Sequence, residues 1–201
     1  TQCRLCEHPV VLVVQDTTEL DSSDHPPKDA RCLNNEKRFG LYEHDILAVT
    51  PDKLCLGVVG TESFDRAAES LGQTLQRRTL PIEEKESFRW LQGYRLACQL
   101  AVECPATQIV SVADCEADMY DIFVEARDQS GPRAEYILRA KEDRSTLERD
   151  PESGPRAYRK VREEVARSER RTTKTIELCQ TPKRAARQAH VEIRAIAVQV
   201  K

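Results

Sequence analysis

The architecture expected of this chain follows first from the run Val10-Val11-Leu12-Val13-Val14-Gln15-Asp16. Consecutive apolar residues, most of them β-branched, predict a strand that is buried on both faces at the centre of a sheet. A second run, Ile109-Val110-Ser111-Val112-Ala113-Asp114, has the same character and also ends on an aspartate. The two runs therefore predict two central strands, each with a carboxylate at its carboxyl end.

The two aspartates at these strand ends are candidate ligands. Open α/β sheets bind ligands outside the carboxyl ends of their strands, and two carboxylates there can share a divalent metal ion. Asp16 and Asp114 therefore predict a metal-dependent active site. The alternative is that each aspartate only starts a turn or caps the following helix, and the two strand ends by themselves leave that alternative open.

The segments between and after the two runs predict a mixed sheet. Polar residues 17–40 predict a long loop, and residues 41–50 and 54–60 predict a hairpin. Helices are expected over 82–102 and 116–127, and a strand over 136–140. The order β-β-β-α-β-α-β predicts an α/β fold of the ribonuclease-H type, in which the first and fourth strands are neighbours. Asp16 and Asp114 are then expected side by side.

The rest of the chain differs in composition and charge. Residues 142–201 predict a helix over 158–167 and strands over 172–179 and 190–200. Residues 1–132 hold 13 Lys and Arg against 23 Asp and Glu, whereas residues 133–201 hold 18 against 11. An acidic part with candidate metal ligands beside a basic part suits a protein that handles a phosphate backbone. A basic stretch that is only solvated remains the alternative.

The apolar runs and the cysteines indicate the cellular setting expected for this chain. No apolar run approaches the roughly 20 residues that would span a bilayer, so no membrane partner is expected. Because no secretory signal is present, the eight cysteines are expected to be reduced thiols in a cytosolic setting. Cys3 and Cys6 form a Cys-x-x-Cys with no second pair at zinc-finger spacing, and are expected to be incidental. Both ends of the chain are expected to be cut from a longer polypeptide.

Several ordered blocks resemble a known family. They are Val13–Leu20 (VVQDTTEL), Gly40–Thr50 (GLYEHDILAVT), Glu84–Leu91 (EKESFRWL), Asp114–Tyr120 (DCEADMY) and Tyr136–Lys141 (YILRAK). Together they resemble, in order, the bacterial DDE transposases of the insertion-sequence-four group. The resemblance implies a ribonuclease-H-like catalytic core that cuts double-stranded DNA at transposon ends and joins the freed 3′ ends to a target. It also implies a bacterial, cytoplasmic protein that is a homodimer when complete.

The resemblance implies roles for the two aspartates. Two Mg²⁺ or Mn²⁺ ions held by three carboxylates would activate the nucleophile and stabilise the leaving oxygen, with Asp16 bridging both ions and Asp114 holding one. Residues 1–141 would be the first part of the catalytic core, and 142–201 part of a basic, β-rich insertion subdomain. The amino-terminal DNA-binding domain and the carboxyl-terminal catalytic helix would be absent.

The chain also departs from the family pattern. Cys115 stands where an arginine usually follows the second aspartate, and no tyrosine completes the Tyr-x2-Arg-x3-Glu-x6-Lys pattern that carries the third carboxylate. This chain alone is therefore expected to be catalytically inactive. A decayed or truncated transposase fragment, inactive and at most DNA-binding, is the alternative function. A phosphatase with a nucleophilic aspartate is disfavoured, since Thr18 stands where such enzymes place a second aspartate.

Several residues other than the two aspartates are candidates for a functional role. Lys85, Arg139 and Lys141 are candidate contacts for the DNA backbone, with local ion pairs or simple solvation as the alternative. His44, although it belongs to one of the blocks, is expected to be a hydrogen-bonded packing residue rather than a ligand. Trp90 is expected in the core. Glu116 and Asp118 flank Asp114 and are expected mainly to complement a helix dipole.

Overall fold

The chain forms two compact units in a computed structural model, residues 1–141 and 142–201. The structure describes residues 2–28, 31–33, 35, 37–65, 79–127, 133–150, 152, 154 and 157–201. Among the described residues, no helix is both long and apolar enough to cross a membrane.

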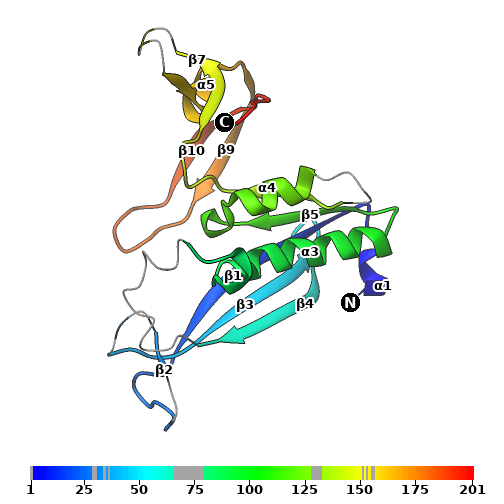
Figure 1. The fold of residues 1–201 in the computed structure, drawn as a ribbon, viewed down its shortest axis with the longest axis vertical. Helices are drawn as coiled ribbons and strands as arrows, with labels where there is room; N and C mark the ends of the chain where they lie inside the picture. Colours follow the sequence, from blue (N-terminus) through cyan, green and yellow to red (C-terminus); the bar gives the residue numbers. More distant parts are fainter. Residues whose placement is uncertain are drawn as a thin grey trace. The chain divides into compact units, whose positions relative to one another are not determined.

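The first unit is built on a mixed β-sheet (Figure 1). Its strands are β1 (Val10–Asp21), β2 (Arg31–Cys32), β3 (Phe39–Val49), β4 (Cys55–Phe64), β5 (Gln108–Ala113) and β6 (Glu135–Leu138). Their order is β2-β3-β1-β5-β6, with β4 also paired to β3. β1 runs antiparallel to β3 and parallel to β5, and β5 runs parallel to β6. The α/β class and the adjacency of the two apolar strands are as expected from the sequence.

The prediction of a loop over residues 17–40 was wrong at both ends of that range. β1 continues to Asp21, so Asp16 lies inside the strand and not at its carboxyl end, as had been expected. β3 begins at Phe39, and a short strand β2 lies between β1 and β3 in the sequence. The polar extension is held by cross-strand pairing, which runs on to Leu20↔Leu41 and Asp21↔Gly40. A Cβ atom at position 40 would lie 2.1 Å from the carbonyl oxygen of Leu20, so only glycine permits this close pairing.

Helices cover one face of this sheet (Figure 1). They are α1 (Gln2–Leu5), α3 (Phe88–Glu103) and α4 (Tyr120–Arg127), with 3₁₀ turns η2 (Ile82–Glu84) and η3 (Cys115–Ala117). The helix expected from residue 82 begins only at Phe88, because the backbone turns extended at Lys85 (φ −95°, ψ 144°). The helix expected from residue 116 likewise starts as a 3₁₀ turn. Trp90 lies in the core, 2% exposed, as predicted.

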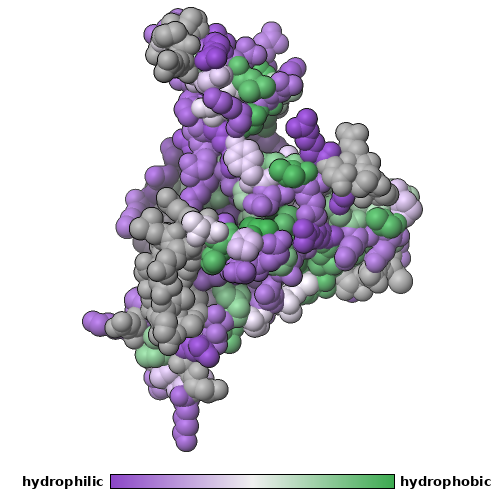
Figure 2. Space-filling view, viewed as in Figure 1, coloured by the Kyte–Doolittle hydropathy of each residue, from purple (hydrophilic) through white to green (hydrophobic). Residues whose placement is uncertain are grey.

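The second unit consists of small elements with mostly exposed side chains. They are β7 (Ser145–Arg149), β8 (Tyr158–Lys160), α5 (Val161–Arg167), β9 (Arg170–Leu178) and β10 (Arg187–Arg194). β7 pairs with β8, and β9 with β10, in two separate two-stranded sheets. Figure 2 shows hydrophilic residues over most of the visible face of this unit. A two-stranded sheet needs a further layer for independent stability, so local packing contributes little here.

Two expectations for the second unit need correction. Residues 158–160, expected as the start of a helix, form strand β8, because Tyr158 and Lys160 pair with Arg149 and Ser145. The last expected strand stops at Arg194, and Val200 makes only an isolated bridge to Thr146. In both places the pairing partner, which the local sequence does not specify, determines the backbone conformation.

Candidate functional site

The two predicted aspartates lie just beyond the same end of the β1–β5 parallel pairing. β1 and β5 pair in register from Val10↔Gln108 to Val14↔Val112. Asp16 and Asp114 each follow the last of these pairs by two positions, although they are 98 positions apart in the sequence. Side chains alternate between the two faces of a strand, so residues two positions apart share a face. Asp16 and Asp114 are therefore expected on the same face of the sheet as Val14 and Val112.

Asp114 has two local roles. Its Oδ1 accepts a hydrogen bond of 2.7 Å from the backbone N–H of Glu116, so it caps the 3₁₀ turn η3. Its Oδ2 lies 3.4 Å from a guanidinium nitrogen of Arg139, and the Asp114 side chain is 39% exposed. The capping alternative raised from the sequence is therefore present in the structure. The second carboxylate oxygen, whose partner Arg139 is itself highly exposed, stays accessible to solvent.

Asp16 lies directly opposite a third carboxylate that the sequence interpretation missed. Asp45 on β3 is the cross-strand partner of Asp16, and its Oδ1 accepts a hydrogen bond of 2.7 Å from the hydroxyl of Thr61. Like charges directly opposite each other on neighbouring strands are unfavourable, and a bound cation relieves that repulsion. A long segment separates β1 from β3, so no local signal in the sequence sets the register that pairs Asp45 with Asp16.

A buried polar chain lies on the opposite face of the same strands. The Thr17 hydroxyl and His44 Nδ1 are 2.8 Å apart, His44 Nε2 is 3.4 Å from the Gln15 amide oxygen, and the Gln15 amide donates to Ser111 at 3.0 Å. His44 is 1% exposed, and its ring meets the Trp90 ring edge-on at 4.6 Å between centroids. These bonds join β3, β1 and β5 directly behind the aspartates.

His44 is a packing residue, as expected. Burial, assisted by the positive charge of Arg89, lowers the pKa of His44 to about 4. The imidazole is therefore neutral near pH 7 and bonds to its neighbours without a charge. Since its side chain lies on the α3 face, it stands on the opposite side of the sheet from the carboxylates.

The predicted DNA contacts fall in different places. Arg139 follows β6, is 71% exposed, and one of its guanidinium nitrogens lies 3.3 Å from Cys115 Sγ and 3.4 Å from Asp114. Lys141 is exposed, and its backbone N–H donates to Asp118 at 2.7 Å. Lys85 is half-buried between η2 and α3. The structure thus brings Arg139 to Asp114, and positions Lys141 near the loop that follows η3.

The donor set suits a hard divalent cation only in part. Carboxylate oxygens are the ligands that Mg²⁺ and Mn²⁺ prefer, and Mg²⁺ keeps several waters when few protein ligands are available. Asp16, Asp114 and the nearby Asp45 supply such oxygens. Within the described part of the chain, however, no three acidic, histidine or cysteine side chains converge closely enough to hold an ion. Asp16 and Asp114 would therefore leave most coordination positions of such an ion to water.

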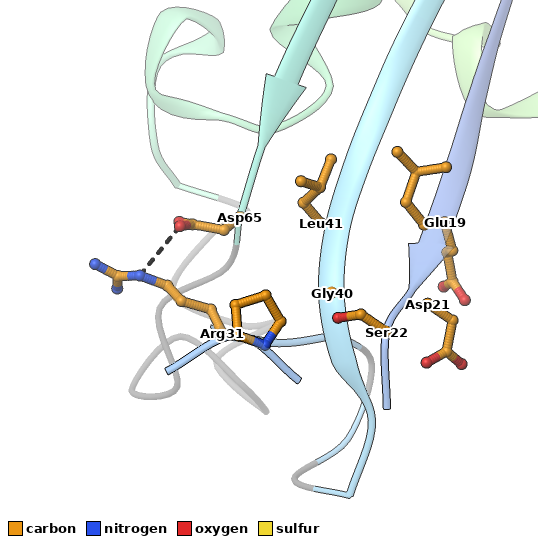
Figure 3. Close-up of a pocket in the computed structure, with 9 residues that line it drawn as sticks. Glu19, Asp21, Ser22, Arg31, Gly40, Leu41 and Asp65 are labelled. Atoms are coloured by element: carbon orange, nitrogen blue, oxygen red, sulfur yellow. Dashed lines mark ion pairs between the residues drawn. The ribbon is translucent and has the colours of Figure 1, made fainter. Parts of the chain in front are cut away.

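A hollow lies beyond Asp16 along β1. It has a volume of about 530 Å³ and is lined by residues of β1, β2 and β3, among them Leu20, Gly40 and Leu41. Figure 3 shows that Asp65 reaches Arg31 across its mouth, and the two form an ion pair of 3.1 Å. Asp21, on its far side, pairs with Arg38 at 2.8 Å. These charges compensate one another, and neither Asp16 nor Asp114 lines this hollow.

The cysteines differ from expectation in one pair. Cys6 and Cys104 are joined by a disulfide, whereas Cys32, Cys55, Cys98, Cys115 and Cys179 are free thiols. The expectation of reduced thiols was therefore wrong for Cys6 and Cys104. The strand pairing that starts at Val10↔Gln108 brings the two together, and no local pattern in the sequence indicates this. The side chain of Cys3, the other half of the Cys-x-x-Cys, lies outside the described residues.

No family model and no curated protein matches this chain. A functional assignment therefore depends on the sequence blocks and on the sheet geometry described above.

Proposed function

We propose that this chain is part of the catalytic domain of a DDE transposase of the insertion-sequence-four group, with a ribonuclease-H-like core. The observation that carries the proposal is the parallel pairing of β1 with β5, after which Asp16 and Asp114 follow at equivalent positions. The order of the sheet, with β3 and β4 antiparallel on one side of β1 and β5 and β6 parallel on the other, supports the same fold. Residues 142–201 would be part of the inserted subdomain.

In this function Asp16 and Asp114 hold Mg²⁺ or Mn²⁺. When bound, such ions supply Lewis acidity and an activated nucleophile for cleavage and strand transfer of DNA. The chain's own contribution is to position the two carboxylates: the β1–β5 register aligns them, and the cap to Glu116 orients Asp114. Arg139, already 3.4 Å from Asp114, is placed to contact a phosphate that approaches the same edge.

The partners proposed for the complete protein follow from that reaction. They are the double-stranded DNA of the transposon ends and of the target, and a second copy of the protein. Lys85, Arg139 and Lys141 are proposed contacts to the DNA backbone. The proposed setting is the bacterial cytoplasm.

A second candidate is favoured by the incomplete ligand set. Among the residues that the structure describes, no third carboxylate converges with Asp16 and Asp114. Cys115 also stands where the family pattern has an arginine. A decayed or truncated transposase that is inactive, and at most binds DNA, has these same features. The two candidates differ in what the gene encodes after Lys201.

The test extends the reading frame and then measures cleavage. The transposase proposal predicts a downstream Tyr-x2-Arg-x3-Glu-x6-Lys motif, and Mg²⁺-dependent nicking of DNA by the extended protein that is lost in Asp16→Asn and in Asp114→Asn. The present chain alone is expected to give no nicking. A stop codon before the motif supports the decayed fragment instead. An extended protein whose nicking is unchanged by both substitutions overturns the assignment of the two aspartates.

A further inference from the structure

The Cys6–Cys104 disulfide joins the two segments that lead into the central strands. Cys6 lies between α1 and β1, and Cys104 follows directly after α3 and precedes β5. The backbone N–H of Gln108 donates to the Pro9 carbonyl at 2.9 Å, just before β1 and β5 begin to pair. The disulfide thus lies next to the amino ends of β1 and β5.

The segment that this disulfide secures has few other attachments. Helix α1 spans only Gln2–Leu5, and a helix of one turn is not stable by itself. Leu5 is nevertheless 0% exposed and belongs to the main hydrophobic core. Besides this packing, the Leu5 carbonyl accepts a hydrogen bond of 3.3 Å from the Thr107 hydroxyl. A covalent bond at Cys6 therefore holds a short segment whose leucine fills the core.

The two cysteines differ in accessibility. Cys6 is exposed at the surface, whereas Cys104 is 2% exposed. A thiolate that attacks this disulfide from solution therefore meets Cys6 first. Cys3 precedes Cys6 at the Cys-x-x-Cys spacing of redox-active pairs, which the proposed function does not use.

We propose that Cys6 and Cys104 form a reversible redox latch on the amino-terminal segment. In closing, the two thiols are oxidised to one disulfide while a low-molecular-weight disulfide such as oxidised glutathione is reduced to two thiols. Both electrons and both protons of the cysteine thiols pass to that co-reactant. In a reducing compartment the latch is open, and an oxidising shift closes it. The latch lies next to the amino ends of β1 and β5, and it does not depend on the proposed function.

The test is thermal unfolding in glutathione buffers of varied redox ratio. A closed loop of 98 residues restricts the unfolded chain, so oxidation is expected to raise the Tm by about 10 °C. Cys6→Ser removes the redox dependence, whereas the matched control Cys32→Ser, at a free cysteine, keeps it. Peptide mapping of the oxidised protein is expected to find Cys6 linked to Cys104, and reduced glutathione to reverse the link.

Two results overturn the latch. One is an equal redox dependence of Tm in the unaltered protein and in Cys6→Ser. The other is a Cys3–Cys6 link, or no link at Cys104, in the oxidised protein. Mapping uses the unaltered chain, so it decides the question even where Cys6→Ser does not fold.

Discussion

Gly93 lies where helix α3 passes over β1, and its missing side chain is part of the packing. A Cβ atom there would lie 2.0 Å from the Gln15 amide oxygen. Gln15 is 2% exposed and bonded to Ser111, so it cannot move aside at low cost. We expect Gly93→Ala to lower the free energy of unfolding by about 1–3 kcal/mol, despite the better helix propensity of alanine. Urea unfolding measures this.

The control for that substitution is Gln92→Ala, an exposed neighbour on the same helix. It is expected to change the free energy of unfolding by less than about 0.5 kcal/mol. Equal stabilities of the Gly93→Ala and Gln92→Ala proteins would show that α3 does not pack closely on Gln15.

His44 predicts a pH dependence of stability. Its pKa of about 4 in the folded protein lies below the ordinary value of 6.5, so between pH 4 and pH 6.5 the folded state binds fewer protons than the unfolded state. Stability from this residue is complete above pH 6.5 and is lost as the pH falls towards 4. Once the pH has fallen to the folded pKa, the free energy of unfolding is lower by about 3 kcal/mol.

The matched variant is His44→Gln, which keeps a polar side chain that does not titrate. Chemical unfolding from pH 7 to pH 4 is expected to show a steeper decline for the unaltered protein than for the variant. Because the carboxylates titrate in both proteins, the difference isolates His44. Parallel declines would mean that the buried imidazole does not resist protonation.

At the scale of single elements, Asp114 has a capping role that can be separated from a ligand role. Its carboxylate accepts the N–H of Glu116 at the start of η3. Asparagine keeps this acceptor and removes the charge, whereas alanine removes both. We expect Asp114→Ala to lower the free energy of unfolding by about 1 kcal/mol relative to Asp114→Asn. Thermal unfolding of the two variants measures it, and equal stabilities would contradict the cap.

The local sequence predicts some of the strands but not their full extent. β1 and β5 were predictable because uninterrupted β-branched runs have few alternatives to a buried strand. The continuation of β1 through Thr17–Asp21 was not, because pairing with β3 overrides a polar local sequence. The same limit applies to the site: strand order predicts Asp16 beside Asp114, but Asp45 requires the cross-strand register. The disulfide joins residues 98 positions apart and has no local signal.

At the scale of the whole molecule, charge is divided between the two parts of the chain. Residues 133–201 carry a net charge of +7 and residues 1–132 a net charge of −10. If the basic part contacts the DNA backbone, affinity for double-stranded DNA falls steeply with salt. Lys174→Gln and Arg187→Gln, both on the exposed β9–β10 hairpin, are each expected to reduce the slope of log K against log salt by about 1.

Fluorescence anisotropy with a duplex at several salt concentrations measures that slope. Lys28→Gln, an exposed lysine of the first unit, is the control and is expected to leave it unchanged. A salt-independent affinity, or an equal effect of all three substitutions, would contradict DNA binding by the basic part.

We propose that Asp16 and Asp114 together hold a divalent cation. Binding of Mn²⁺, followed by electron paramagnetic resonance of the free ion, tests it on the present chain without any requirement for catalysis. We predict weak binding that falls at least about tenfold in Asp16→Asn and in Asp114→Asn, a change that corresponds to about 1.4 kcal/mol. Asp52→Asn, at an exposed turn, is expected to bind like the unaltered protein. Unchanged affinity in both Asp16→Asn and Asp114→Asn would contradict the claim.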